Sequence, residues 1–584
     1  MDDVRYNELL GLPVNGGISS MAEHCPVEAG VAGSNPVCHP MNNNLIKSDN
    51  RSLSLSKYTL ALIAKWEEGS RASGNSHNKI SVSQTVSFAA FLYEKMRNAV
   101  EFKEDHLIRR CAIERIIKRR MILNENGRDI AEPLIKELLW ARYYENNTIG
   151  EEKIVEIQTI IDKYFFLRNE LSRGRSGREQ ENLANFMLEV LSCEIEENLS
   201  PSQKREAFTN YVYQILRPHI MPFSGNNGLQ EKDVQVYIAV EKTLSHSDSA
   251  VIRYHLLKLM IPEITQITWK NSDSLLTQLY DIYQHIGKYL RYPQADKLRN
   301  IIKKEIPAFL ILKDIFEQNP RSISQIITSE EQLKFKVDEA CRKRYDESKT
   351  RLRRTGIRSF IYILLTKIIF ALLLEIPYDL YFLKSISILP ISINVIFPPF
   401  LMFLIILSVT VPGDDNTRKI YQLILGTIDN NPETPDAIHS QIDIDRRGKA
   451  RGLLFTSIFS LLYLLTYFIS FGSIIYVLSF LKFSVVSQGI FIFFVTLVTF
   501  FAFKVIQITQ EYQVILHEGF LTPITDFFFL PVIRVGQWLS GEILSKFNVL
   551  IFIFDFIIEM PFKAIVEVID EWVHFVRLKK EEMI

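Results

Sequence analysis

The chain has 584 residues, which is enough for two or three domains with buried cores. Its 67 basic and 67 acidic residues cancel, so net charge gives no reason to expect a nucleic-acid partner. The five cysteines show neither CxxC pairing nor metal-ligand spacing: Cys25, Cys38, Cys111, Cys193 and Cys341. This scatter favours reduced thiols in a cytosolic compartment, and no cofactor motif accompanies them.

The first forty residues lack the apolar run of a signal peptide and begin with two acids after Met1. Gly33-Ser34-Asn35-Pro36 can be encoded by GGTTCGAATCC, which resembles the T-arm of a transfer RNA gene. Suitable codons for residues 16–18 and 38–40 are complementary, as in an acceptor stem. Residues 16–40 therefore resemble a translated transfer RNA gene, a hypothesis that the genomic DNA tests. On this interpretation residues 1–40 are a spurious or disordered extension, with Met41 as an alternative start.

Residues 41–80 are polar and rich in Ser and Asn, which predicts a flexible lead-in. From residue 81 to residue 350, apolar residues recur at three- and four-residue spacing, the period of amphipathic helices. Ser200-Pro201-Ser202-Gln203 combines an N-cap serine, a proline at the first helical position and a capping glutamine. With no alternation of strands and helices, residues 81–350 are predicted to form an all-α soluble domain.

Three motifs before the membrane segments resemble phosphate- or metal-binding sites, but in each case a structural role is favoured. Residues 69–75 (GSRASGN) superficially look like a phosphate loop, but Asn75 replaces the lysine that such a loop needs. The basic loop 173–178 could hold phosphate, although an interhelical linker is favoured. His246, Asp248 and His255 lack any recognised metal-ligand spacing, so ordinary structural histidines are favoured.

One predicted helix carries a basic face beside an apolar one. Its candidate lipid-facing patch consists of Arg109, Arg110, Lys118 and Arg119. Such a face can rest on anionic lipid headgroups, which would suit a domain tethered to a membrane. A solvated face is the favoured alternative.

Four segments are long and apolar enough to cross a bilayer as helices: 357–383, 386–411, 452–481 and 485–508. A bend is expected in the first at Pro377, and a kink in the second at Pro398-Pro399. The chain is therefore predicted to be an all-α protein, in which a cytosolic multi-helix domain precedes a polytopic membrane domain.

Basic residues flank alternate ends of these spans. They precede the first span (Arg342, Lys343, Arg344, Lys349, Arg351, Arg353, Arg354, Arg358) and separate the second from the third (Arg418, Lys419, Arg446, Arg447, Lys449, Arg451). The other two connections hold one lysine each, Lys384 and Lys482. This pattern predicts that both termini are cytoplasmic, in the plasma (inner) membrane.

Residues 509–584 contain apolar stretches that are too short or too interrupted to span. We expect amphipathic helices lying on the cytoplasmic leaflet, anchored by Trp538 and Trp572. A re-entrant hairpin, adding a fifth and sixth span, is the alternative.

Two charges lie inside the first span, Lys367 and Glu375. Eight residues separate them, which places them about 80° apart around a helix. A charge exposed to hydrocarbon costs roughly 2.5–3.5 kcal/mol, so both are expected to face the bundle. The expected partners are each other, Asn394 or Gln488, and the pair either lines a solute or proton path or fixes helix packing.

No nucleophile elbow, metal motif or paired-carboxylate signature is present, so the chain is not expected to be an enzyme. A membrane-anchored scaffold or interaction protein is favoured, with the lipid bilayer and protein partners of the cytosolic domain as its contacts. The alternative is a subunit of a small-solute or ion transporter or channel using Lys367 and Glu375. A homo-oligomer is compatible with either role, because four spans alone make a small pore.

Overall fold

The computed structural model describes residues 53–515, the helix Phe527–Ser540 and scattered positions between 565 and 579. The longer gaps fall at 72–77, 84–86, 96–103, 124–126, 222–227, 266–272, 385–387 and 429–452, and a few single positions are also left out. The transfer-RNA-like stretch therefore lies outside the described residues. Across the described part of the chain the regular elements are helical, and β-pairing is limited to isolated bridges such as that between Lys79 and Gly150. The predicted all-α class is confirmed.

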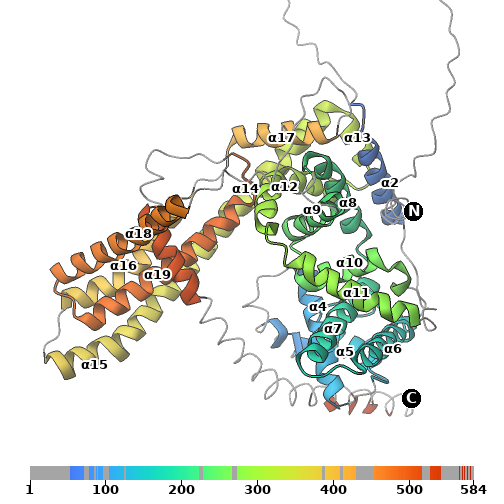
Figure 1. The fold of residues 1–584 in the computed structure, drawn as a ribbon, viewed down its shortest axis with the longest axis horizontal. Helices are drawn as coiled ribbons and strands as arrows, with labels where there is room; N and C mark the ends of the chain where they lie inside the picture. The colour runs from blue at the N-terminus through green and yellow to red at the C-terminus, as the bar shows by residue number, and fades with distance from the viewer. Residues whose placement is uncertain are drawn as a thin grey trace, which may run out of the picture.

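The helical domain contains two apolar cores, formed largely by different helices (Figure 1). The first lobe comprises α4 (Asp105–Leu123), α5 (Ala131–Trp140), α6 (Glu152–Ser172), α7 (Arg178–Leu199), α10 (Ser249–Met260) and α11 (Asp273–Leu290). Ile113, Ile161 and Ile252 are fully buried at its centre. Aliphatic side chains at helical spacing on several helices thus form one shared core.

The second lobe surrounds three aromatic side chains. It comprises α2 (Lys57–Arg71), α8 (Gln203–Leu216), α9 (Gly228–Leu244), α12 (Ala295–Gln318), α13 (Ile323–Thr328), the start of α14 (Glu330–Phe370) and α17 (Asp414–Ile428). The Trp66 ring packs edge-on against Phe316, with 5.3 Å between ring centroids, and against Phe208 at 6.4 Å. Edge-on aromatic pairs of this kind add to the stability that burial provides.

The helix predicted to begin near residue 200 begins slightly later. Ser200 caps the C-terminus of α7, while Ser202 occupies the N-cap of α8 and its hydroxyl donates to Glu206. The capping pattern therefore predicted a helix start correctly but assigned it to the wrong serine, because the preceding helix extends to Leu199.

One continuous helix runs from the second lobe into the membrane bundle. From Glu330 it runs through α14, two π-helical segments (η3, Ala371–Glu375; η4, Asp379–Leu383) and the short α15 (Ile376–Tyr378) between them. Pro377 lacks an N–H and its ring crowds the carbonyl one turn earlier, which accounts for the wider π turns. The expected bend at Pro377 thus takes the form of a widened helix, which ends where Lys384 is left-handed (φ 51°).

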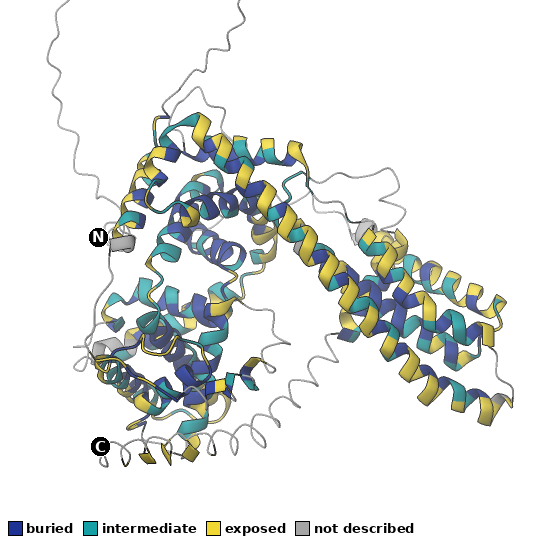
Figure 2. Ribbon diagram, turned by 180° about the vertical axis from the view of Figure 1, so that it is seen from behind, coloured by how far each residue is buried: buried dark blue, intermediate teal, exposed yellow. Residues whose placement is uncertain are grey.

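Among the described residues, four helices are long and apolar enough to cross a membrane, as predicted: Glu330–Phe382, Ile388–Leu407, Ser457–Phe480 and Val485–Tyr512. The last three correspond to α16 (Ile388–Leu407), α18 (Leu453–Phe480) and α19 (Val485–Thr509). α16 continues through Pro398-Pro399 and packs between α14 and α19. Most side chains of α18 are exposed, as Figure 2 shows, and this apolar surface is suited to lipid.

Three segments separated by spans meet on the second lobe. α17, between the second and third spans, packs against α12 and α14. Its Asn416 accepts from the backbone N–H of Val514 (2.8 Å) and of Ile515 (3.1 Å), which follow the fourth span. The same amide donates to the Tyr345 hydroxyl of α14 at 2.8 Å. The chain before span one, between spans two and three, and after span four is therefore gathered on one side of the bundle.

The helix Phe527–Ser540 lies against α19. A Cβ added at Gly536 would come within 2.2 Å of the Thr496 carbonyl oxygen, and Val532 belongs to the apolar cluster that includes Val495. Thr496 is near the middle of α19, about 17 Å from its start at 1.5 Å per residue. The structure thus places this part of the tail beside the middle of α19, and whether it lies on the leaflet or forms part of a re-entrant hairpin stays a prediction.

Candidate functional site

The candidate site is a buried polar cluster inside the membrane bundle. The Lys367 ammonium donates to Asn394 Oδ1 at 2.5 Å, and the Asn394 amide donates to Glu375 Oε1. Lys367 Nζ is 3.7 Å from Glu375 Oε1, and all three side chains are at most 1% exposed. The two charges therefore face the bundle, and Asn394, one of the two predicted polar partners, joins them.

Helices α14, α16 and α19 position this cluster. The Asn394 amide also lies 3.5 Å from the Ser487 carbonyl oxygen at the start of α19, and the Lys367 ammonium is 4.3 Å from the centre of the Phe494 ring. Gln488, the other predicted partner, donates instead to the Ser479 hydroxyl (3.2 Å) and so stays outside the cluster. A ring face attracts the cation while excluding water, so Phe494 supports a buried ammonium.

Asp379 is a further buried acid that the sequence did not single out. It lies four residues after Glu375 on the same helix and is 3% exposed. Its spacing of one helical turn from a residue already expected to face the bundle was the signal that could have found it. The site thus contains one basic and two acidic side chains.

Three of the four arginines and lysines of the candidate lipid-facing patch are paired within the helical domain. Arg109 binds Glu196 at 2.7 Å, Arg110 binds Asp248 at 2.7 Å, and Arg119 binds Glu137 at 2.6 Å. Lys118 alone of the four is exposed. This corrects the expectation of an outward-facing patch: acids on α5, α7 and the α10 N-cap, distant in sequence, hold the arginines against the domain.

The structure does not bring the candidate metal residues together. His246 lies 3.4 Å from Glu511, and the His255 ring lies 3.0 Å from Glu241. Asp248 caps α10 by accepting from the N–H of Val251. Among the described residues no cluster of three or more His, Cys, Asp or Glu side chains is arranged to hold a metal ion.

The basic loop at residues 173–178 connects α6 to α7. Arg175 stacks 4.0 Å from the centre of the Tyr280 ring and pairs with Glu179 at 3.3 Å, while Arg173 pairs with Glu170 at 2.8 Å. Gly174 and Gly177 take positive φ angles of 76° and 63°, where a side chain would be strained. These contacts are those of a linker between two helices.

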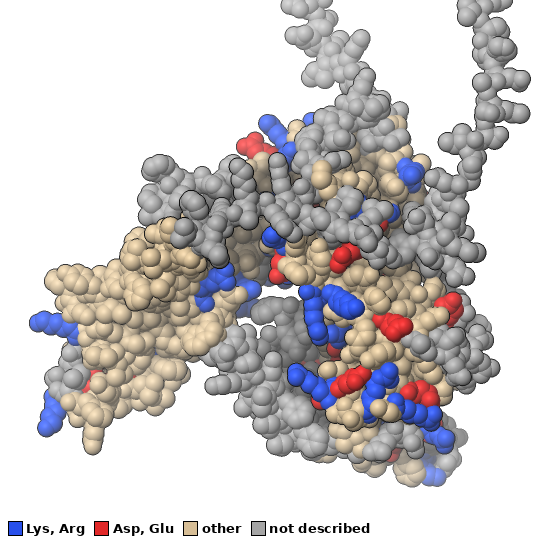
Figure 3. Space-filling view, in the orientation of Figure 1, with Lys and Arg blue, Asp and Glu red and all other residues tan. Residues whose placement is uncertain are grey.

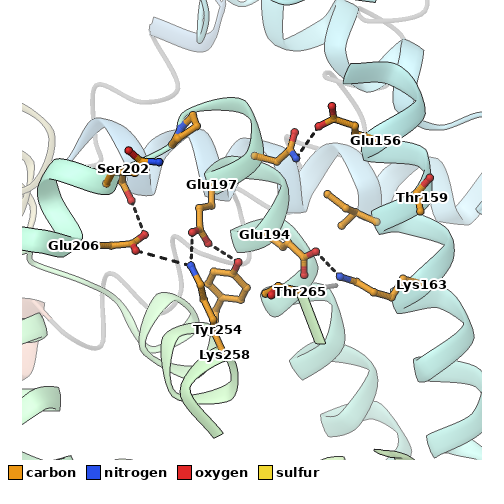
Figure 4. A pocket seen from close by; sticks show the side chains of 14 residues that line it. Glu156, Thr159, Lys163, Glu194, Glu197, Ser202, Glu206, Tyr254, Lys258 and Thr265 are labelled. Carbon is orange, nitrogen blue, oxygen red and sulfur yellow. Dashed lines mark hydrogen bonds and ion pairs between the residues drawn. The ribbon is translucent and has the colours of Figure 1, made fainter. Parts of the chain in front are cut away.

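A separate cavity of about 340 Å³ is lined by helices of the first lobe and by the start of α8 (Figure 4). Lys258 lies between Glu197 (2.5 Å) and Glu206 (3.9 Å), and the Tyr254 hydroxyl also donates to Glu197. Burial alone would raise the pKa of Glu197, but Lys258 and Tyr254 hold that pKa below its usual range. Since the acids that line the cavity are already paired, it offers a ligand little unmet charge.

Charged side chains are absent from most of the visible bundle surface. Figure 3 shows basic side chains where the bundle meets the helical domain and at its far end, with a largely uncharged surface between. Trp538 and Trp572, the predicted interfacial anchors, are each 64% exposed. No family model, curated protein sequence or solved structure matches the chain.

Proposed function

We propose that the chain is a non-enzymatic, membrane-anchored scaffold whose helical domain binds other proteins at the membrane surface. The observation that carries this proposal is the attachment of that domain to the bundle by three segments: α14, α17 and residues 511–515. A domain held at three points keeps a fixed position relative to the bilayer. Fixed presentation is what an interaction platform needs, since it reduces the entropy lost when partners assemble.

We propose a topology with both termini on the cytoplasmic side of the plasma (inner) membrane. Support comes from the clustering of α17 and residues 511–515 on one lobe, and from the basic residues gathered at the same end. Phosphatase reporters fused at Lys384 and Lys482 are expected to be active, and one fused at Asn430 inactive. Phosphatase activity from the Asn430 fusion would contradict this topology.

Crosslinking in native membranes tests the scaffold. A photo-reactive amino acid at exposed positions of the helical domain, such as Phe335 and Val155, is expected to give discrete adducts with other proteins. The matched control places it at Tyr476 on the lipid-suited face of α18, where protein adducts are not expected. Equal labelling of lipid alone from all three positions would contradict the proposal.

A second candidate is a subunit of a small-solute or ion transporter or channel, favoured by the buried Lys367–Asn394–Glu375 cluster. The double variant Lys367→Met with Glu375→Gln removes both charges at similar volume. A scaffold keeps its protein adducts in this variant, whereas a transporter loses flux in proteoliposomes. Loss of flux together with unchanged adducts would favour the second candidate.

A further inference from the structure

Two buried carboxylate oxygens in the bundle lack hydrogen-bond partners among the described residues. They are Glu375 Oε2 and Asp379 Oδ1, on side chains that are 1% and 3% exposed. The other Glu375 oxygen, Oε1, accepts from the Asn394 amide. A buried acceptor without a donor is costly, and in hydrocarbon no water replaces the donor.

The two acids occupy equivalent places on the distorted part of the helix. Glu375 ends the first π-helical segment and Asp379 begins the second, with Ile376-Pro377-Tyr378 between them. Residues four apart on a helix are neighbours, and Asp379 acts electrostatically on Glu375. The free oxygens therefore belong to adjacent side chains on one face of α14 and its extension.

The described charges around this pair do not balance. Lys367 is the single basic group in the cluster, against two acids. α16 and α18 contain no Asp, Glu, Lys, Arg or His. The ionisable residue of α19 is Lys504, near the opposite end from Ser487. Lys384, five residues after Asp379 where the helix ends, is exposed to the outside of the bundle, as are Lys482 before α19 and Arg534 of the tail helix. With both acids ionised the cluster would carry a net negative charge at membrane depth, which is strongly unfavourable.

We propose that Glu375 and Asp379 form a proton-binding site in which one proton is shared between the two carboxyl groups. The proton is taken up from water: one carboxylate becomes a carboxylic acid, and its O–H donates to the free oxygen of the other. This reaction supplies the missing donor and makes the cluster electrically neutral. It is independent of the scaffold proposal, because the charge balance is the same whether or not anything crosses the membrane.

A metal cation fits the pair less well than a proton. Calcium takes six to eight oxygen ligands and magnesium needs near-octahedral geometry, whereas two unpartnered oxygens are found here. Asn394 Oδ1, another oxygen of the cluster, already accepts from Lys367. A shared proton needs no further ligands.

Infrared spectroscopy of the full chain, purified in an ester-free detergent at neutral pH, tests the site. Exposed carboxyls are ionised at this pH, so a carboxylic acid C=O stretch reports a protonated buried acid. We expect this band in the wild type and its loss in both Glu375→Gln and Asp379→Asn, each of which keeps the size of the side chain. Each variant is an independent test of the site, so if one fails to fold the other still tests the proposal.

The control is Glu339→Gln, an exposed acid on the cytosolic part of α14, which is expected to keep the band. Absence of the band in the wild type, its persistence in either site variant, or its loss in the control would overturn the proposal. Loss of the wild-type band on replacing choline chloride with sodium chloride at equal ionic strength would also overturn it, by identifying an alkali cation as the occupant.

Discussion

Buried charges are satisfied differently in the first lobe and in the membrane bundle. In the lobe, Glu194 accepts from Lys163 through one oxygen and from the Tyr164 hydroxyl (2.6 Å) through the other. In the bundle, Glu375 accepts through one oxygen, and the other has no partner among the described residues. The helices of the lobe contain many hydrogen-bond donors, whereas the bundle helices contain few. Among the described residues, a donor therefore meets each oxygen of Glu194 but only one oxygen of Glu375.

A second acid of the helical domain makes the same point through its pKa. Burial alone would raise the pKa of Glu241, but the His255 ring and the Ser247 and Tyr237 hydroxyls lower it to about 2. Three partners thus keep a fully buried carboxylate ionised. Asp379 and Glu375 together have no comparable set of donors, which is why an added proton is the expected occupant there.

The largest expected effect is on the bundle cluster. Lys367→Met leaves Glu375 without its cation and should reduce the free energy of unfolding by roughly 3–5 kcal/mol, the usual cost of removing one partner of a buried ion pair. Denaturation of the purified full chain in mixed detergent micelles measures it. Lys367→Met with Glu375→Gln should recover most of the loss, and equal stability of the single variant and the wild type would contradict the account of the cluster.

The matching change in the helical domain should cost less. Glu194→Gln is expected to destabilise the first lobe by about 2–3 kcal/mol, because Lys163 keeps the Ile264 carbonyl (2.8 Å) as a hydrogen-bond acceptor. Chemical denaturation followed by tryptophan fluorescence measures the change. A loss larger than that caused by Lys367→Met would reverse the comparison between the two regions.

A packing change tests the contact between the tail helix and the bundle. Gly536→Ala should destabilise the membrane domain by about 1–2 kcal/mol, because the new methyl group would overlap the Thr496 carbonyl oxygen. Gly472→Ala on α18 is the matched control, since an added Cβ there meets nothing within 4 Å. Thermal unfolding of both variants in detergent measures the difference, and equal melting temperatures would show that the two helices do not touch.

The smallest effect at neutral pH concerns His106 of α4, and it grows on acidification. Burial, with Arg205 and Arg109, lowers the pKa of His106 from 6.5 to about 3. Between these values the unfolded chain binds the proton and the folded chain does not, so stability falls as pH falls. The slope should be about 1.4 kcal/mol per pH unit below 6.5.

His106→Gln should remove this slope, and the exposed His285→Gln variant is its control. Urea denaturation at a series of pH values measures both. His255 does not contribute to the slope below pH 6.5. Its interaction with Glu241 raises its pKa against the effect of burial, so the stability it contributes is complete below pH 6.5 and is lost only as pH rises. An unchanged slope in His106→Gln would contradict the assignment.

The sequence predicted the membrane half better than the details of the soluble half. The four spans follow from the length of the apolar segments alone. Asn394 could be predicted as a partner of Lys367 and Glu375 because polar side chains are scarce in the spans. The arginines of α4 were misassigned because their partners, Glu137, Glu196 and Asp248, come from other elements, and periodicity carries no information about such pairing.

The docking of α17 on the second lobe could have been predicted from the sequence. Ile420, Leu423, Ile424 and Ile428 recur at helical spacing in a segment treated as a connection between spans, and the structure buries all four in the second lobe. The docking of Asn416 onto Val514 could not be predicted, since a polar side chain near a span end has many equivalent partners in sequence. The contact of Gly536 with Thr496 could not be predicted for a similar reason.

The position of α17 sets an order for biosynthesis. Ribosomes make the second lobe's other helices first, then two membrane spans, and only afterwards the helix that completes the lobe's core. Until both spans have been inserted, the apolar surface that α17 covers stays open on the nascent chain. Maturation of the helical domain is thereby linked to successful insertion, and a fragment ending at residue 350 would be made without the helix that closes its core.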